Sequence, residues 1–130
     1  MYLRFTTRFT DETGQSVTGI FNAVAYVRDY AATDKADVDQ LAELYQWFNK
    51  NLKVPPCFDA YDDPHNLSPL AWFKDSAAEH IRMMRHIVRL LAKYDVVVEM
   101  IHSRDPGPIL YHDEFQVAAF PPHTRQLQVH

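Results

Sequence analysis

The sequence is short of the residues that mark several protein classes. It holds one cysteine, Cys57, so no disulfide can form within the chain, and we expect a reducing, cytoplasmic location. Only three glycines and no low-complexity tract argue against disorder. No apolar run is long enough to span a bilayer, and the first residues lack the apolar run of a signal peptide. We therefore expect no membrane association.

Apolar residues, in contrast, are plentiful. They make up 47% of the 130 residues, and 13% are aromatic, which is enough bulk for one hydrophobic core. We predict a single α+β domain over residues 1–122 and a flexible C-terminal tail over 123–130.

The formal net charge of -4 gives no general electrostatic reason to bind nucleic acid. The charge is unevenly spread, because residues 29–63 are mainly acidic and residues 74–93 mainly basic. These two segments either pack against each other or recognise a charged partner.

Apolar periodicity predicts the elements of the first half. Alternation over residues 2–9 predicts a strand that buries Leu3, Phe5, Thr7 and Phe9. Residues 11–15 are typical of a turn. A helix is favoured over 17–30, although its β-branched residues also allow a strand. Asp34 is a suitable N-cap for a second helix, whose apolar stripe consists of Val38, Leu41, Tyr45, Phe48 and Leu52.

Pro55 and Pro56 end that helix and open a long connection over residues 53–69, which Phe58 and Tyr61 are expected to pin to the body. A short strand follows at 70–74. Ser76 and Glu79 match a capping box that begins a third helix, which runs to about residue 94. Strands are predicted at 96–102 and 109–120. The resulting fold is α+β, with about four strands in an antiparallel or mixed sheet and helices on one face.

The last of these strands carries the clearest pattern. Residues 109–119 alternate strictly, but Asp113 occupies an apolar position, and a carboxylate there needs a partner. A four-residue loop at 105–108 would pair this strand with 96–102, placing His102 opposite Tyr111 and Met100 opposite Asp113. The predicted cluster of His102, Asp113 and Tyr111 is either a structural lock or the catalytic centre of a small hydrolase, with His102 as general base.

Two further groups are candidates for binding. Basic side chains recur at helical spacing in the third helix, at Arg82, His86, Arg89 and Lys93, with Arg85 beside them. Such a stripe occurs both on helices that bind phosphate groups and on helix faces that are simply solvated. Two pairs of adjacent aromatic residues, Trp47-Phe48 and Trp72-Phe73, are also candidates. In each pair, either one member lines a groove or both members pack in the core. The candidate binding residues are Trp72, Lys74, Arg82, Arg85 and Arg89.

Metal-binding motifs are absent, since the histidines lack ligand spacing and no cysteine pair exists. We expect no metal and no cofactor. The sequence places no basic cluster or helix N-terminus at Cys57, which favours an idle thiol over a nucleophile.

Several segments together resemble a group of small bacterial proteins of similar length to which no activity is assigned. They are Trp47-Phe48-Asn49, Trp72-Phe73-Lys74 with Ser76-Ala77, Pro106-Gly107, Ile109, Tyr111 and residues 113–119. The resemblance implies a small soluble bacterial domain and assigns no functional residue. We therefore predict a cytoplasmic interaction or regulatory protein without catalytic activity, which binds a protein partner or itself. The alternatives are the hydrolase and, less favoured, nucleic-acid binding through the stripe over 82–93.

Overall fold

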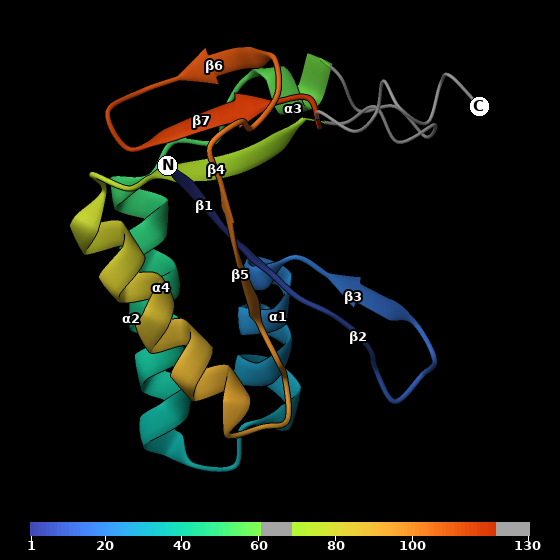
Figure 1. Ribbon diagram of the computed structural model, residues 1–130. Helices are drawn as coiled ribbons and strands as arrows, with labels where there is room; N and C mark the ends of the chain where they lie inside the picture. Colours follow the sequence, from blue (N-terminus) through green and yellow to red (C-terminus); the bar gives the residue numbers. More distant parts are fainter. Residues whose placement is uncertain (61–68, 122–130) are drawn as a thin grey trace. The chain divides into compact units, whose positions relative to one another are not determined.

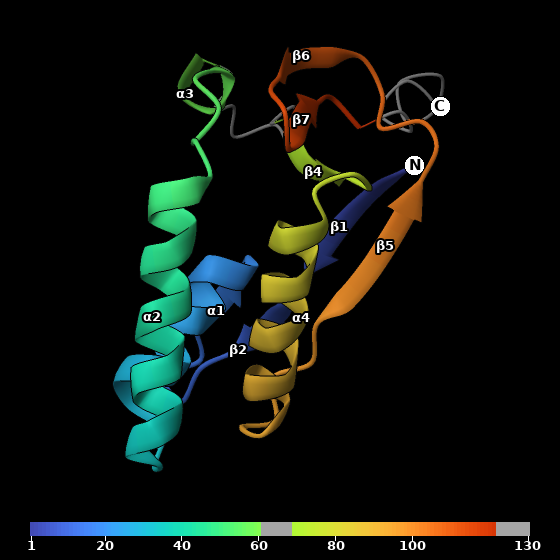
Figure 2. The ribbon, with the colours of Figure 1, turned by 90° about the vertical axis from the view of Figure 1, so that its left-hand side faces the viewer.

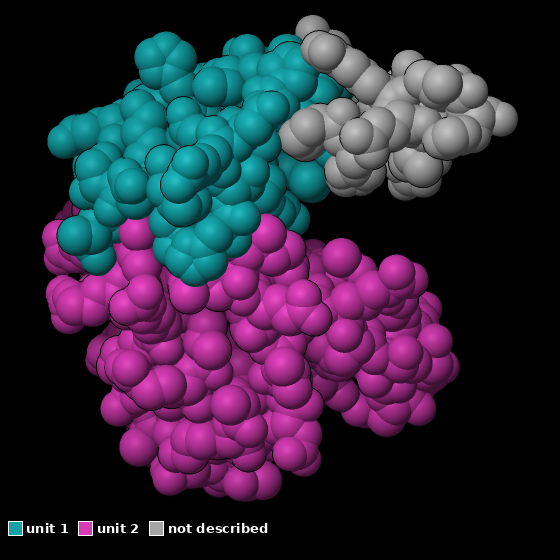
Figure 3. Space-filling model, viewed as in Figure 1, with its two compact units in different colours: residues 1–4, 53–78, 102–130 teal, residues 5–52, 79–101 magenta. Residues whose placement is uncertain are grey.

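A computed structural model describes residues 1–60 and 69–121 and shows an α+β fold (Figure 1). The chain divides into two compact units, coloured separately in Figure 3. The first holds residues 1–4, 53–78 and 102–130, and the second holds residues 5–52 and 79–101. The predicted tail and Tyr61 lie outside the described residues, and the single-domain boundary stays a prediction.

In the described part of the chain, five strands form the main sheet, one more than the approximate number predicted. Their order is β5 (Glu99–Ser103), β1 (Tyr2–Thr6), β4 (Leu70–Lys74), β7 (Gln116–Ala119) and β6 (Ile109–His112). A separate antiparallel hairpin joins β2 (Arg8–Thr10) to β3 (Ser16–Thr18). The predicted strand over 2–9 therefore exists as β1 and β2 with a break at Thr7, and Leu3, Phe5 and Thr7 are buried as expected.

The expected pairing of the last strands is wrong. Residues 109–119 are a hairpin of two strands, in which Ile109 pairs with Ala119 and His112 with Val117. Asp113 lies in the turn between them. The strand over 96–102, found as β5, lies beside β1 at the opposite edge of the sheet from β6. The register shifts between Ile109 and Tyr111, so Tyr111 pairs with Ala118, and all four residues of β7 are buried.

Helices make up most of the second unit. They are α1 (Ile20–Tyr26), which continues into a π-helical turn over Val27–Ala31, α2 (Lys35–Asn51) and α4 (Ala78–Ala92). The short α3 (Cys57–Ala60) belongs to the first unit. The predicted helix over 17–30 begins late, because β3 takes residues 16–18 and Gly19 has a φ of 96°.

The predicted N-cap of α2 is confirmed, since the Asp34 carboxylate accepts a 2.9 Å hydrogen bond from the Ala36 amide.

Helices α2 and α4 run antiparallel and lie side by side (Figure 2), as contacts at both ends show. The largest fully buried side chains of this unit are Val24, Val27, Leu41, Met84, Ile87 and Leu91. The predicted stripe of the second helix thus places Leu41 and Phe48 correctly in a hydrophobic core.

The turn that follows helix α4 contains a residue with left-handed backbone. Asp95 has a φ of 64°, and the Val96 amide reaches back to the Leu91 carbonyl at 3.1 Å while the Asp95 amide reaches that of Ala92. This is the Schellman arrangement, which most helices complete with glycine. Val96 is 5% exposed and Leu91 is fully buried, so the turn is also closed by apolar burial.

Candidate functional site

Tyr111 and Asp113, two members of the predicted cluster, do meet. The Tyr111 hydroxyl donates a 2.7 Å hydrogen bond to Oδ2 of Asp113. Tyr111 belongs to β6 and Asp113 to the turn that follows it, so a local hairpin brings the pair together.

The Asp113 carboxylate is occupied by groups of its own turn. Its Oδ1 accepts from the Phe115 amide at 2.8 Å and the Gln116 amide at 3.1 Å. Its Oδ2 also accepts from the Gln116 side-chain amide at 3.1 Å. The backbone closes the same turn, because the Asp113 amide donates to the Gln116 carbonyl at 3.0 Å. A side chain used in this way stabilises a tight turn.

The electrostatics agree with that structural use. Partial burial opposes ionisation of Asp113, but the hydrogen bonds from Phe115, Tyr111 and Gln116 outweigh it and lower the pKa of the carboxyl. The hydrogen bond to Asp113 raises the pKa of Tyr111. Asp113 is thus held ionised, with its lone pairs engaged by donors that belong to the hairpin.

His102, the third predicted member, lies elsewhere. It is exposed on β5, and the strand order β5-β1-β4-β7-β6 puts β5 and β6 at opposite edges of the sheet. The expected proximity depended on pairing 96–102 with 109–119, which the structure does not have. The proposed general base therefore does not contact Asp113.

Gln116 was missed as a structural residue. It is 2% exposed, and its side-chain amide donates to the Lys53 carbonyl at 2.6 Å as well as to Asp113. This links the hairpin to the segment that opens the 53–69 connection. The sequence placed Gln116 on the polar side of one long strand, so only knowledge of the hairpin could have found it.

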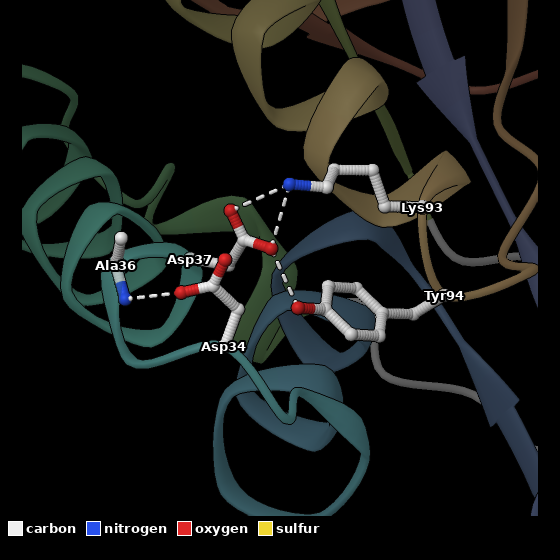
Figure 4. A network of polar contacts seen from close by, with 5 residues as sticks. All are labelled: Asp34, Ala36, Asp37, Lys93 and Tyr94. Atoms are coloured by element: carbon white, nitrogen blue, oxygen red, sulfur yellow. Dashed lines mark hydrogen bonds and ion pairs between the residues drawn. The ribbon is translucent and has the colours of Figure 1, made fainter.

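A second polar network, in the helical unit, was also missed (Figure 4). Asp37 of α2 is only 4% exposed, and its carboxylate lies between Lys93 and Tyr94. The Lys93 ammonium is 2.8 and 2.9 Å from the two carboxylate oxygens, and the Tyr94 hydroxyl donates at 2.6 Å. The network ties the start of α2 to the end of α4. An acid in the first turn of a helix usually faces solvent, so the sequence carried no signal for its burial.

The basic stripe of α4 is only partly available. Lys93 is engaged by Asp37, and Arg82 lies 3.8 Å from Glu79 with its side chain 70% exposed. Arg85 and Arg89 are exposed. The stripe has the features of a solvated helix face.

The two tryptophans are not surface residues. Trp72 is 7% exposed, whereas Trp47 is half-buried with its ring 4.9 Å from that of His80. Lys74 is half-buried beside Trp72 on β4. Arg4 of β1 joins them, as its guanidinium carbon lies 5.8 Å from the centroid of the Trp72 ring. Sequence reasoning did not single out Arg4, because its strand partner was unknown.

Strand β5 presents an unusual amount of apolar surface. Val97, Met100 and Ile101 are 75%, 41% and 38% exposed. They lie on or just before a strand at one edge of the main sheet, adjacent to β1. Large exposed side chains are common singly, but here three lie within five residues. Met100 and Ile101 are consecutive, so they expose apolar surface on both faces of the strand.

Within residues 1–60 and 69–121, no three His, Cys, Asp or Glu side chains gather closely enough to hold a metal ion. In the same part of the chain, no helix has the length and apolar character needed to cross a bilayer. Comparisons of the chain with protein-family models, curated proteins and solved structures found no match.

Proposed function

We propose that this protein is a non-catalytic interaction module that binds a second copy of itself through strand β5. The observation that carries the proposal is the exposure of Met100 and Ile101 on an edge strand, with Val97 exposed just before it. An edge strand has a row of backbone N–H and C=O groups that its sheet does not use, and another strand satisfies them best. The apolar side chains add burial to that backbone pairing.

The two edges of the sheet differ in how well they are protected. Strand β6 has an irregular register between Ile109 and Tyr111 and follows Pro106 and Pro108. Bulges and prolines are devices that discourage a further strand. Strand β5 is a run of five residues without proline. Of these two edges, β5 is therefore the one suited to accept a partner.

The sequence of β5 is compatible with pairing to itself. In a two-fold antiparallel pair of identical strands, one residue lies opposite its own copy. With Met100 at that position, Glu99 faces Ile101 and Val98 faces His102. No like charges are then opposed, and the two methionines meet across the axis.

The site geometry supports a role without catalysis. Asp113 and Tyr111 form a hairpin lock, and His102 lies on the opposite edge strand. The cytoplasmic location stays part of this proposal, on the ground of the single cysteine.

Sedimentation equilibrium over a range of protein concentrations tests the proposal. We expect the wild type to form a dimer, and Met100→Lys and Ile101→Lys to be monomeric, because a charge on an edge strand opposes pairing. Val54→Lys is the matched control, since Val54 is 78% exposed but lies outside the strands. A wild type that stays monomeric at every soluble concentration would overturn the proposal, as would lysine variants that dimerise normally.

Hydrogen exchange locates the interface independently. Amides of residues 99–103 should exchange more slowly as protein concentration rises, whereas those of β6 should not change. Protection that appears at β6 instead would show a dimer built in another way. Far-UV circular dichroism of each variant separates lost pairing from lost folding.

A further inference from the structure

Arg4, Trp72 and Lys74 share one face of neighbouring strands. Tyr2 pairs with Lys74 and Leu3 with Phe73 in the β1–β4 register. One step further along this register, Arg4 lies opposite Trp72. Side chains two apart on a strand point to the same face, so Lys74 and Trp72 lie on the face that Arg4 shares. All three residues belong to the first compact unit.

These three side chains are hydrogen-bond donors, and the described residues offer them few acceptors. The indole Nε1 of Trp72 is buried and has no hydrogen-bond partner among residues 1–60 and 69–121. Arg4 donates from Nη1 to the Ala71 carbonyl at 3.1 Å, and neither it nor Lys74 forms an ion pair in the described part of the chain. The acid next in sequence, Asp75, is 3.7 Å from the amino group of Met1.

Such an arrangement is costly unless an acceptor completes it. A buried donor left unsatisfied loses the hydrogen bond it had with water, and a half-buried cation loses hydration. Burial lowers the pKa of Arg4, as expected for a guanidinium without an anionic neighbour. None of the three side chains can accept a hydrogen bond in its ordinary protonation state, so the missing group must be an acceptor.

We infer that Arg4, Trp72 and Lys74 form a binding site for a small oxyanion, either a carboxylate or a phosphate. The planar guanidinium matches two oxygens of either group, and the ammonium adds a second positive charge. The indole N–H supplies a directed third donor. Because the indole Nε1 is buried, an oxygen reaches it only when the side chains around Trp72 move aside. The chain as a whole has a charge of -4, so this attraction is local.

The indole protons give a direct readout. The chain has two tryptophans and therefore two indole N–H signals in a ¹H–¹⁵N spectrum, which Trp47→Phe assigns. We titrate the wild type separately with inorganic phosphate, acetate and chloride at matched ionic strength. The Trp72 signal should move saturably with phosphate, acetate or both, and the stronger of the two identifies the oxyanion class. No movement with either, or an equal movement with chloride, would overturn the inference.

Variants test whether the named residues carry the binding. Arg4→Gln should weaken it about tenfold or more, the loss expected for one charge-assisted hydrogen bond, and Lys74→Gln should weaken it less. Arg89→Gln is the control, because it removes an equal charge from an exposed helical position. If Arg4→Gln does not fold, the stability of Lys74→Gln decides: the oxyanion should raise its melting temperature less than that of the wild type. Equal affinity in wild type, Arg4→Gln and Lys74→Gln would rule the site out.

Discussion

The hydroxyl of Tyr94 donates a 2.6 Å hydrogen bond to the carboxylate of Asp37, 57 residues earlier in the chain. Lys93 binds the same carboxylate, so two consecutive residues after the last turns of α4 hold the first turn of α2. The hydrogen bonds from Lys93 and Tyr94 lower the pKa of Asp37, and those to Asp37 raise the pKa of both partners. The network is thus most stable with Asp37 ionised, Lys93 charged and Tyr94 protonated.

Asp37→Asn should lower the melting temperature by several degrees at neutral pH. Because the folded carboxyl has the lower pKa, the unfolded chain binds more protons in acid, and the contribution of Asp37 is lost as pH falls below about 4. On the alkaline side, the raised pKa values of Tyr94 and Lys93 mean that their contribution is lost as pH rises above about 10. Melting temperatures of the wild type and Asp37→Asn, measured across this pH range, check both the acid and the alkaline loss of stability.

Asp39→Asn is the control for that experiment, since Asp39 is an exposed partner of Lys35 on the same helix. A double-mutant cycle of Asp37→Asn with Tyr94→Phe should show coupling between the two residues. An Asp37→Asn variant that melts as the wild type does, with the same acid limb, would show that the network contributes nothing.

Asp113→Ala should destabilise the protein by about 1–3 kcal/mol, because the Phe115 and Gln116 amides lose their acceptor. Tyr111→Phe should lower the stability less than Asp113→Ala does, because it removes a single hydrogen bond. Asp113→Asn should fall between them, as its carbonyl can still accept from the two amides. Urea unfolding measures each value, with exposed His112→Ala as the control. Unchanged urea midpoints for Asp113→Ala would refute the hairpin lock.

Asp95→Gly should stabilise the protein by about 0.5–1 kcal/mol, since glycine adopts the left-handed backbone at this position without a Cβ penalty. Asp95→Ala keeps that penalty and should bring no gain. The same urea experiment distinguishes them. A loss of stability in Asp95→Gly would mean that the Asp95 side chain contributes more than its backbone costs.

Arg85→Glu and Arg89→Glu should each change stability by no more than about 0.5 kcal/mol, as expected for an exposed helix face. We also expect neither the wild type nor the double variant to bind a DNA duplex at low salt, as measured by fluorescence anisotropy. Wild-type binding that falls steeply with salt and is abolished by the two substitutions would restore the nucleic-acid hypothesis.

The elements that were predictable from the sequence are those set by nearby residues. The N-cap Asp34, the stripe through Leu41 and Phe48 and the strand over 70–74 all depend on local chemistry or period. The structure places these elements within about a residue of their expected bounds.

The pairing of strands was not predictable in the same way. Residues 109–119 reverse at Asp113 without a glycine or proline to mark the turn, because the turn is built from side-chain hydrogen bonds. That one error placed His102 in the candidate site. Arg4 was missed for a separate reason, because its relation to Trp72 depends on which strand lies beside β1.

The unequal edges of the sheet limit how far association can proceed. If both β5 and β6 accepted strands, each copy could add to the next and the sheets would extend into a fibre. Of the two edges of the main sheet, the irregular register of β6 leaves β5 as the one suited to a partner. In the dimer proposed above, growth therefore stops at two copies, so the unequal edges set the stoichiometry.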